Sequence, residues 1–273
     1  MIRPMLAADI AAATQVILDG GWSDRSVFFE WAVAHPTCFP LVAEADGQVV
    51  GTGVATVNGR VGWVGAIFVA EDRRRNGLGS ALSLAVVEEL ERRGCVTQVL
   101  IATNEGRPIY ERLGFSVHAR YVLETTPDAA PPPDDGRVRP YAASDFDAIA
   151  DLDRRATGED RASILRGFAS PETGLVALRG DGTVGAFVVR ASWGGRALVA
   201  SEPDLALALL DARRRASRDK PVMIGIFEDN AAGRARLAEA GWTERQGGPR
   251  LIRGEPLDWR PDWIYGQFTG AIG

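Results

Sequence analysis

The chain has 273 residues, 46% of them hydrophobic, which is enough for two domains of ordinary size. Its net charge is −5, and neither half has the basic excess typical of a nucleic-acid-binding protein, so no nucleic-acid partner is expected. There is no signal-peptide pattern and no apolar run as long as a membrane span, which predicts a soluble, cytoplasmic protein without a membrane partner. The only lysine, Lys220, follows no GxxxxG, which excludes a Walker-type phosphate loop.

Residues 1–123 carry the pattern of a mixed α/β unit. Helices are expected over residues 9–19, 26–35, a stretch that ends near 93, and 105–113. Strands are expected over residues 41–45, 49–56, 62–69, 96–102 and 115–123, and the turns Asp46-Gly47 and Asn58-Gly59 are hairpin signals. The unit is therefore expected to be a mostly antiparallel, twisted sheet flanked by helices.

A second unit follows an acidic, proline-rich linker at residues 124–137. Residues 138–273 repeat three segments of the first unit in the same order: 2–10 at 138–146, 41–51 at 175–185, and 104–115 at 230–242. The shared residues include Arg3 and Asp9, which recur as Arg139 and Asp145. This pattern predicts a tandem duplication of one fold unit.

The most informative stretch is EDRRRNGLGSALSLAVVEEL, residues 71–90. A loop that contains Arg74, Arg75, Asn76, Gly77 and Gly79 connects an expected strand to a helix. The unpaired amides and the positive dipole end of the helix would face this loop, and glycines let a large anion approach the backbone. The stretch predicts a pyrophosphate site, although an ordinary turn with solvated arginines is the alternative.

The loop resembles the R/Q-x-x-G-x-G/A signature of the GNAT superfamily of acyl-CoA N-acyltransferases, with Arg74, Gly77 and Gly79 at the signature positions. The strand WVGAIFV and the segment Asn104 to Phe115 stand where that family has its central strand and its acyl-CoA helix. The resemblance implies acetyl-CoA as co-substrate. It implies that the following residues bind it: Ile67, Phe68, Val69, Arg74, Arg75, Asn76, Gly77, Leu78, Gly79, Ser80, Asn104 and Tyr110.

Tyr110 is the expected catalytic residue. In the family, a tyrosine at this position protonates the departing thiolate, and its reference pKa of about 10, against about 8.5 for a thiol, suits that task. Ile109 and Leu113 are expected to form the buried face of the helix, which would leave Tyr110 at the edge; an interfacial core tyrosine is the alternative. The base that takes a proton from the acceptor amine stays open between Glu30, Asp24, Glu44 and a water chain.

Residues of the acceptor site are harder to infer. Trp22 and Phe28 lie in an aromatic cluster that would cover this end of the cleft, with Trp63 in the central strand; packing in the core is the alternative. Near the C-terminus, Asp258 and Asp262 stand among Trp259, Trp263 and Tyr265, a combination suited to an ammonium group, or to sealing the contact between the halves. No metal site is indicated, because His35, His118, Cys38 and Cys95 show no ligand spacing.

The second unit is expected to have lost this chemistry. Its corresponding helix opens with Pro203-Asp204 instead of glycines, and Leu237 occupies the position of Tyr110. The motif GDGTVG at 180–185 lies between two expected strands and is interpreted as a hairpin turn, not a dinucleotide site. The arrangement resembles the tandem two-domain, YitH-like branch of the family. The resemblance implies an N-acetyltransferase that acts on a small-molecule amine, as a monomer or homodimer; the alternative is a non-catalytic acyl-CoA sensor.

Overall fold

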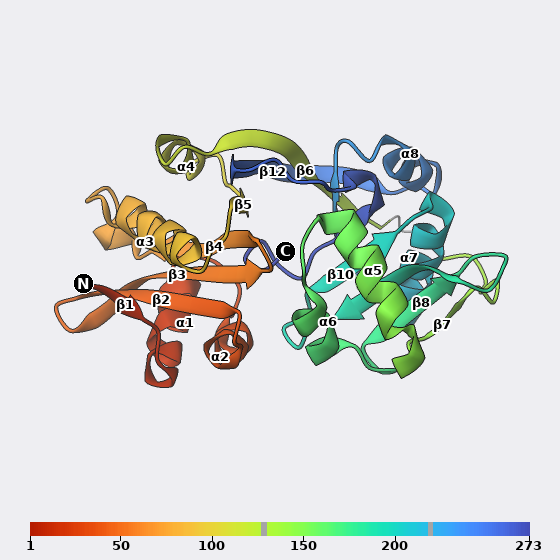
Figure 1. Ribbon diagram of the computed structural model, residues 1–273, viewed down its shortest axis with the longest axis horizontal. Coiled ribbons are helices and arrows are strands. Elements are labelled where there is room, and N and C mark those ends of the chain that lie inside the picture. The colour runs from red at the N-terminus through yellow and green to blue at the C-terminus, as the bar shows by residue number, and fades with distance from the viewer. Residues whose placement is uncertain (127–129, 218–220) are drawn as a thin grey trace. The chain divides into compact units, whose positions relative to one another are not determined.

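A computed structural model describes residues 1–126, 130–217 and 221–273 (Figure 1). These residues form two compact units. Unit 1 consists of Met1–His118, Arg250–Pro256 and Thr269–Gly273, and unit 2 of Ala119–Pro249 and Leu257–Phe268. Among the described residues, no helix is both long and apolar enough to cross a membrane.

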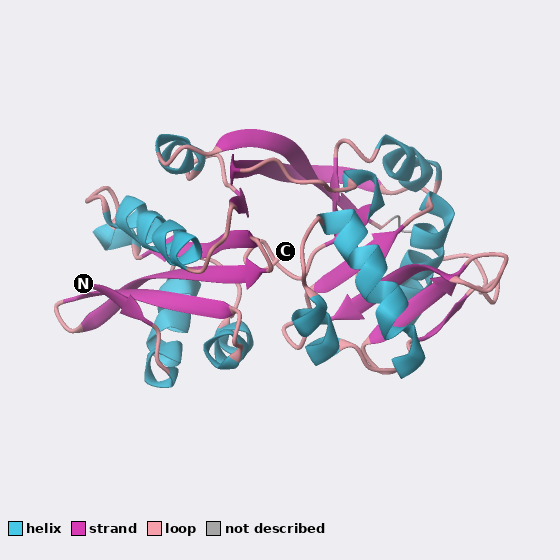
Figure 2. Cartoon of the chain, in the orientation of Figure 1, coloured by secondary structure: helices cyan, strands magenta, loops and turns pink. Residues whose placement is uncertain are grey.

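Unit 1 contains the helices that the sequence of the first half predicts and the predicted strands up to residue 102, together with a first strand that was not predicted. Its helices are α1 (Ile10–Asp19), α2 (Ser26–Ala34), α3 (Leu78–Arg92) and α4 (Arg107–Arg112). Its own strands are β1 (Ile2–Pro4), β2 (Cys38–Ala45), β3 (Gln48–Asn58), β4 (Val61–Val69) and β5 (Thr97–Ile101). Helix α3 lies on one face of strands β2–β4, and α1 and α2 lie on the other (Figures 1 and 2).

Unit 2 repeats this pattern. Its helices are α5 (Phe146–Thr157), α6 (Ala162–Phe168), α7 (Pro203–Ser217) and α8 (Ala231–Glu239). Its strands include β7 (Val138–Pro140), β8 (Gly174–Leu178), β9 (Val184–Arg190), β10 (Arg196–Ala200), β11 (Met223–Phe227) and β13 (Ile264–Gly266). Short 3-10 turns at Ala7–Asp9, Glu71–Arg73, Ala143–Asp145 and Pro261–Trp263 complete the two units.

The two halves of the chain exchange their last long strands, β6 (Ser116–Thr125) and β12 (Thr243–Gly254). Residues Arg250–Gly254 pair with β5 inside unit 1, whereas residues Tyr121–Thr125 pair with β11 inside unit 2. The hydrogen-bonded strand order is β1-β2-β3-β4-β5-β12-β6-β11, with a second sheet ordered β13-β10-β9-β8-β7. The units therefore differ from the expected domain boundaries at 123 and 138, because each half lends a strand to the other.

The expected linker is shorter at its beginning than the sequence suggests. Strand β6 continues to Thr125, where it pairs with Met223, so the first residues of the 124–137 stretch belong to the sheet. Residues 127–129 lie outside the described part of the chain. The first strand after the linker, β7, begins at Val138.

Matching contacts in both repeats show that the sequence similarity reflects a duplicated structure. Arg3 forms two hydrogen bonds with the Asp9 carboxylate, at 2.7 and 2.9 Å, and Arg139 does the same with Asp145, at 2.7 and 2.8 Å. Each aspartate also accepts a hydrogen bond from a backbone amide three residues earlier. The recurring Arg and Asp residues are therefore structural, since they fasten the first strand of each repeat to the turn before its first helix.

Candidate functional site

Strands β4 and β5 run parallel only at their beginnings. Their pairing covers Val61, Gly62 and Trp63 on β4 and then stops. On its other edge, β5 pairs with β12 over its whole length, from Thr97 opposite Gly254 to Ile101 opposite Arg250. The rest of β4 has no ladder with β5 and thus presents backbone groups that an extended ligand can pair with.

A β-bulge interrupts β4 at the same place. The register shifts where Ala66 and Ile67 oppose the single residue Gly53, and Ala66 has the unusual φ of 50°. The Thr52 hydroxyl donates a 2.8 Å hydrogen bond to the Ala66 carbonyl and holds this geometry. Sequence reasoning missed Ala66 and Thr52, because alanine and threonine in a strand give no bulge signal; only the neighbouring Gly65 is suggestive.

Beyond the end of β4, the glycine loop (residues 74–79) turns into helix α3. Arg75 and Gly77 have φ values of 64° and 79°, so two left-handed residues alternate with Asn76. Alternating conformations of this kind curve successive amides into an anion-binding concavity. Gly77 is the N-cap residue of α3 and has no side chain to satisfy the first amides of the helix, and no acidic residue lies in the first turn. The loop has the backbone of a phosphate site.

Two of the three arginines at residues 73–75 are bound to neighbouring protein groups. Arg74 donates from Nε to the Val69 carbonyl at 3.0 Å, and its guanidinium lies 5.3 Å from the Phe68 ring centre. Arg73 forms ion pairs with Asp46 and Asp72. Arg74 therefore fastens the glycine loop to β4, while the exposed Arg75 and Asn76 stay at the mouth of the loop.

The two glycines of the loop differ in what surrounds them. A Cβ built on Gly79 would lie 3.6 Å from Ile109 and 3.8 Å from Val69, which are ordinary contacts, and its φ is not left-handed. The fold therefore does not require glycine here. A Cβ at Gly77 meets nothing within 4 Å, but its φ of 79° favours glycine for conformational reasons.

Tyr110 lies on α4 and is buried, with 9% of its surface exposed. The expected orientation of α4 is wrong: Ile109 and Leu113 are only partly buried, and Tyr110 itself packs into the core, with its ring 6.0 Å from that of Phe115. Burial raises the pKa of Tyr110, and a hydrogen bond with Ser83 on α3 opposes this shift. The phenol therefore stays protonated at neutral pH, as a proton donor must.

The other predicted residues are spread around this centre. Ile67, Phe68 and Val69 follow the bulge on β4, Leu78 and Ser80 begin α3, and Asn104 is exposed in the loop before α4. Trp22 is 40% exposed and meets Phe68 edge-on, at 5.5 Å between ring centres. Phe28 and Trp63 are at most 1% exposed and belong to the core of unit 1.

The three acids considered as a base have other contacts or lie at the surface. The Glu44 carboxylate accepts a 2.9 Å hydrogen bond from Arg3, and the Asp24 carboxylate accepts one of 2.7 Å from the Ser26 amide. Glu30 is exposed on α2. His35 ends α2, and His118 lies on β6, where its Nδ1 is 3.3 Å from Nη1 of Arg250.

Asp258 and Asp262 belong to unit 2. Asp258 is exposed, and Asp262 forms an ion pair with Arg260 at 3.1 Å. The face of Trp263 is covered by the guanidinium groups of Arg155 and Arg260. The acceptor-binding role of the two aspartates therefore remains a prediction.

Unit 2 lacks the features that define the site in unit 1. Helix α7 begins at Pro203 with Asp204 in its first turn, and Asp204 is paired with Arg236 at 2.7 Å. Leu237 occupies the place of Tyr110: the amide of Trp242 donates to the Leu237 carbonyl as that of Phe115 donates to Tyr110, each at 3.0 Å. The 180–185 motif forms the β8–β9 hairpin turn.

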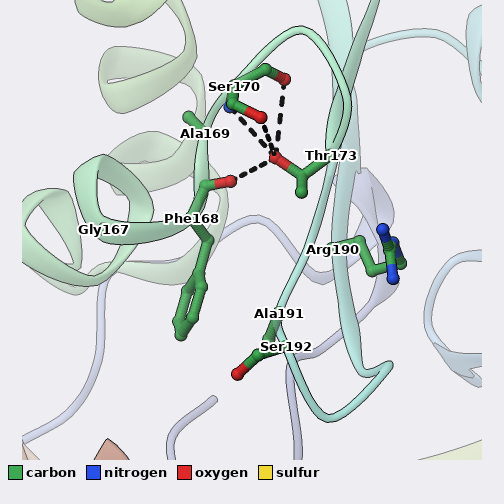
Figure 3. Close-up of a pocket in the computed structure, with 8 residues that line it drawn as sticks. All are labelled: Gly167, Phe168, Ala169, Ser170, Thr173, Arg190, Ala191 and Ser192. Carbon is green, nitrogen blue, oxygen red and sulfur yellow. Dashed lines mark hydrogen bonds between the residues drawn. The ribbon is translucent and has the colours of Figure 1, made fainter.

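A shallow hollow of about 230 Å³ lies between the end of α6 and strand β9 of unit 2 (Figure 3). Two of its hydroxyl groups bond to their neighbours: Thr173 Oγ1 donates to the Phe168 carbonyl and lies 3.0 Å from Ser170 Oγ. The hollow is thus a structural feature of the α6–β8 connection. Within the described ranges, no cluster of three His, Cys, Asp or Glu side chains could hold a metal ion.

Both halves match known families. Residues 8–115 match the acetyltransferase (GNAT) family, and residues 149–266 match an acetyltransferase (GNAT) domain. YitH, an uncharacterized N-acetyltransferase of Bacillus subtilis (strain 168), is 22% identical over 222 residues, which cover 79% of this chain and 78% of that protein.

Solved structures share the fold over the full length. A proposed acetyltransferase of Pyrococcus horikoshii superposes with a TM-score of 0.85 at 21% identity, covering 100% of this chain and 95% of its own. A tandem GNAT protein from the clavulanic acid biosynthesis pathway gives a TM-score of 0.64 at 16% identity, with coverage of 94% and 99%. With one acetyltransferase domain matched in each half and a fold shared with a tandem relative, this chain is an acyltransferase that belongs to the GNAT family, in its tandem two-domain branch.

Proposed function

We propose that unit 1 transfers an acetyl group from acetyl-CoA to the amine of a small metabolite. The observation that carries this proposal is the closeness of two features along the chain: the end of β4, which has no ladder with β5, and the glycine loop, which follows it after the short turn Glu71–Arg73. A coenzyme A molecule has the matching chemistry, because its pantetheine arm carries amides that can pair with a strand, and its pyrophosphate suits the amides of the loop.

The residues present fit such a ligand. The side of Gly77 is open, since a Cβ built there would meet nothing within 4 Å. Residues Arg75 to Ser80 would hold the pyrophosphate through their amides, and Ile67 to Val69 would pair with the pantetheine arm. Asn104, at the loop before α4, would contact the same arm.

Tyr110 would act on the leaving group. Its hydroxyl hydrogen-bonds with Ser83 on α3, and its raised pKa keeps the proton on the phenol at neutral pH. Acyl transfer from a thioester to an amine expels a thiolate, and the phenol can donate its proton to that sulfur. The amine must also lose a proton, and this task is not assigned to Glu30, Asp24, Glu44 or a water chain.

The proposal is tested by measuring acetyl transfer from acetyl-CoA to amines. The purified chain is incubated with acetyl-CoA and a panel of small amines, and release of the free thiol is measured. Amine-dependent thiol release, together with binding of coenzyme A in calorimetry, would support the proposal. Binding without transfer to any amine would favour the acyl-CoA sensor, and the absence of binding would reject both.

A further inference from the structure

The segment Thr269–Gly273 belongs to unit 1, although the residues before it, Leu257–Phe268, belong to unit 2. It forms one compact turn: the Ala271 amide donates to Thr269 Oγ1 at 2.9 Å, and the Gly273 amide donates to the Thr269 carbonyl at 3.2 Å. Ala271 is 5% exposed and Ile272 is fully buried. We call residues 269–273 the terminal turn.

The terminal turn packs on β4 at Gly65. A Cβ built on Gly65 would lie 2.2 Å from the Ala271 Cα and 2.9 Å from the Gly270 carbonyl oxygen. Such distances are shorter than any real contact, so only glycine at position 65 lets the turn reach the strand. A second anchor comes from Asn58 on β3, whose Nδ2 donates to the Ile272 carbonyl at 3.1 Å.

The contact lies on the face of the sheet opposite to α3. Val64 packs into the core with Val86 and Leu90 of α3. Because successive residues of a strand point to opposite faces, Gly65 points to the face covered by α1 and α2. Gly65 also immediately precedes the bulge residue Ala66. The terminal turn therefore covers β4 next to the bulge, on the side away from α3.

We propose that the terminal turn is a wall of the amine-acceptor site. In this proposal the Ala271 side chain limits the size of the group that the acceptor can carry next to its nitrogen. This inference rests on the proposed function and adds to it that the thioester lies at the bulge and that the amine approaches from the face opposite α3. The wall has no ionisable side chain, and its small residues and carbonyl groups suit a primary amine with an unbranched carbon next to the nitrogen.

Bromoacetyl-CoA tests the position of the terminal turn directly. In the Ala271→Cys variant, the thiol would lose its proton to the buffer and its sulfur would displace bromide from the bromoacetyl carbon, forming a thioether. The native thiols give a low background, because Cys38 and Cys95 are buried and burial raises their pKa values to about 12 and about 11. Ala271 is itself only 5% exposed, so the matched control is the similarly buried thiol of Cys95 in the same unit, which is 7% exposed.

We expect the cysteine at position 271 to be alkylated at least about tenfold faster than the control, because a bound electrophile raises its effective concentration. Excess coenzyme A should abolish this advantage, as measured by peptide mass spectrometry. Equal rates in a variant that binds coenzyme A would overturn the inference and leave the proposed function intact. Failure of the unmodified chain to bind coenzyme A would remove the proposed function and the inference together.

A second experiment tests the size limit. Ala271→Gly removes one methyl group, and Ala271→Val adds two. The ratio of kcat/KM for an amine branched next to nitrogen to that for an unbranched amine should rise about tenfold with glycine and fall with valine, a size typical of steric discrimination by a pocket. A ratio that stays constant in both variants, with equal coenzyme A affinity, would contradict the proposed wall.

Discussion

The two units carry the same fold and differ where unit 1 has its candidate site. At the start of α3, Gly77 and Gly79 leave the first amides open, whereas α7 begins with Pro203 and the ion-paired Asp204. Tyr110 on α4 of unit 1 and Leu237 on α8 of unit 2 occupy the same place in the same hydrogen-bonded turn. Both copies thus keep what the fold needs, and only unit 1 keeps the residues that are proposed to carry the chemistry.

What both units retain is equally informative. The Arg3–Asp9 and Arg139–Asp145 pairs have nearly the same geometry. Gly114 and Gly241, which end α4 and α8, have left-handed φ values of 87° and 80°. A residue shared by the repeats is therefore a structural candidate, and a residue present in one repeat alone is a functional candidate.

The largest expected effect comes from removing the Tyr110 hydroxyl on α4, because Leu237 on α8 of unit 2 has no such group. Tyr110→Phe should lower kcat about 10²- to 10⁴-fold, the usual contribution of a general acid, with little change in the affinity for acetyl-CoA. The matched control is Tyr141→Phe, which removes a hydroxyl from a buried tyrosine of unit 2 and should leave kcat unchanged. An equal loss in both variants would show that the effect comes from packing.

The exchanged strand gives the next largest effect. Leu251 on β12 is fully buried in the core of unit 1, so Leu251→Ala should lower the free energy of unfolding by about 2–5 kcal/mol in urea titrations. Val117→Ala on β6 is the control, since Val117 is 48% exposed and its change should stay within about 0.5 kcal/mol.

An engineered disulfide can test whether β12 pairs with β5 in solution. Gln98 on β5 lies directly opposite Arg253 on β12. Opposite residues of antiparallel strands are close enough for a disulfide, so Gln98→Cys with Arg253→Cys should oxidise within one chain. Gln98→Cys with Arg245→Cys should not, because Arg245 lies in the part of β12 that belongs to unit 2. Oxidation of the second pair alone would mean that β12 does not pair with β5 in solution.

A smaller effect should follow from filling the glycine loop. Gly79→Leu leaves the backbone conformation allowed but places a side chain where the anion would bind, so the affinity for coenzyme A should fall at least about tenfold, or about 1.4 kcal/mol, in calorimetry. Asp204→Leu changes the second residue of α7 in unit 2 and should leave the affinity unchanged. Loss of affinity in the Asp204 variant would show that unit 2 also takes part in binding.

Local patterns in the sequence predicted most of the fold, because hairpin turns and helical periodicity involve neighbouring residues. The strand exchange could not be predicted, since residues 250–254 would form the same strand beside either β5 or β11. The orientation of α4 was also missed. The apolar Ile109 and Leu113 suggested its buried side, but this helix has only six residues, and its packing is set by Phe115 beyond its end.

In the candidate site, too, features set by neighbouring residues could be predicted and features set by distant residues could not. The glycine loop was predictable because Gly77 and Gly79 are local signals of an open helix start. The bulge at Ala66 was not, since its φ of 50° depends on the register between β3 and β4. The contact between Gly65 and Ala271 joins residues about 200 positions apart, and no local pattern can indicate it.

The smallest expected effect concerns a feature that both units share, the Arg–Asp pairs. The hydrogen bond from Arg3 lowers the pKa of Asp9 from 3.8 to about 2, and Arg139 lowers that of Asp145 in the same way. A lowered folded-state pKa stabilises the fold above the unfolded pKa, and this stabilisation is lost as the pH falls from about 4 towards 2. The stability difference between the unmodified chain and Asp9→Asn should therefore be constant between pH 5 and 7 and shrink below about pH 4 in urea titrations. Asp145→Asn should show the same pH dependence if the duplication preserved the role of the pair as well as its geometry. A stability difference that persists unchanged at pH 3 would show that the carboxylate charge does not cause the stabilisation.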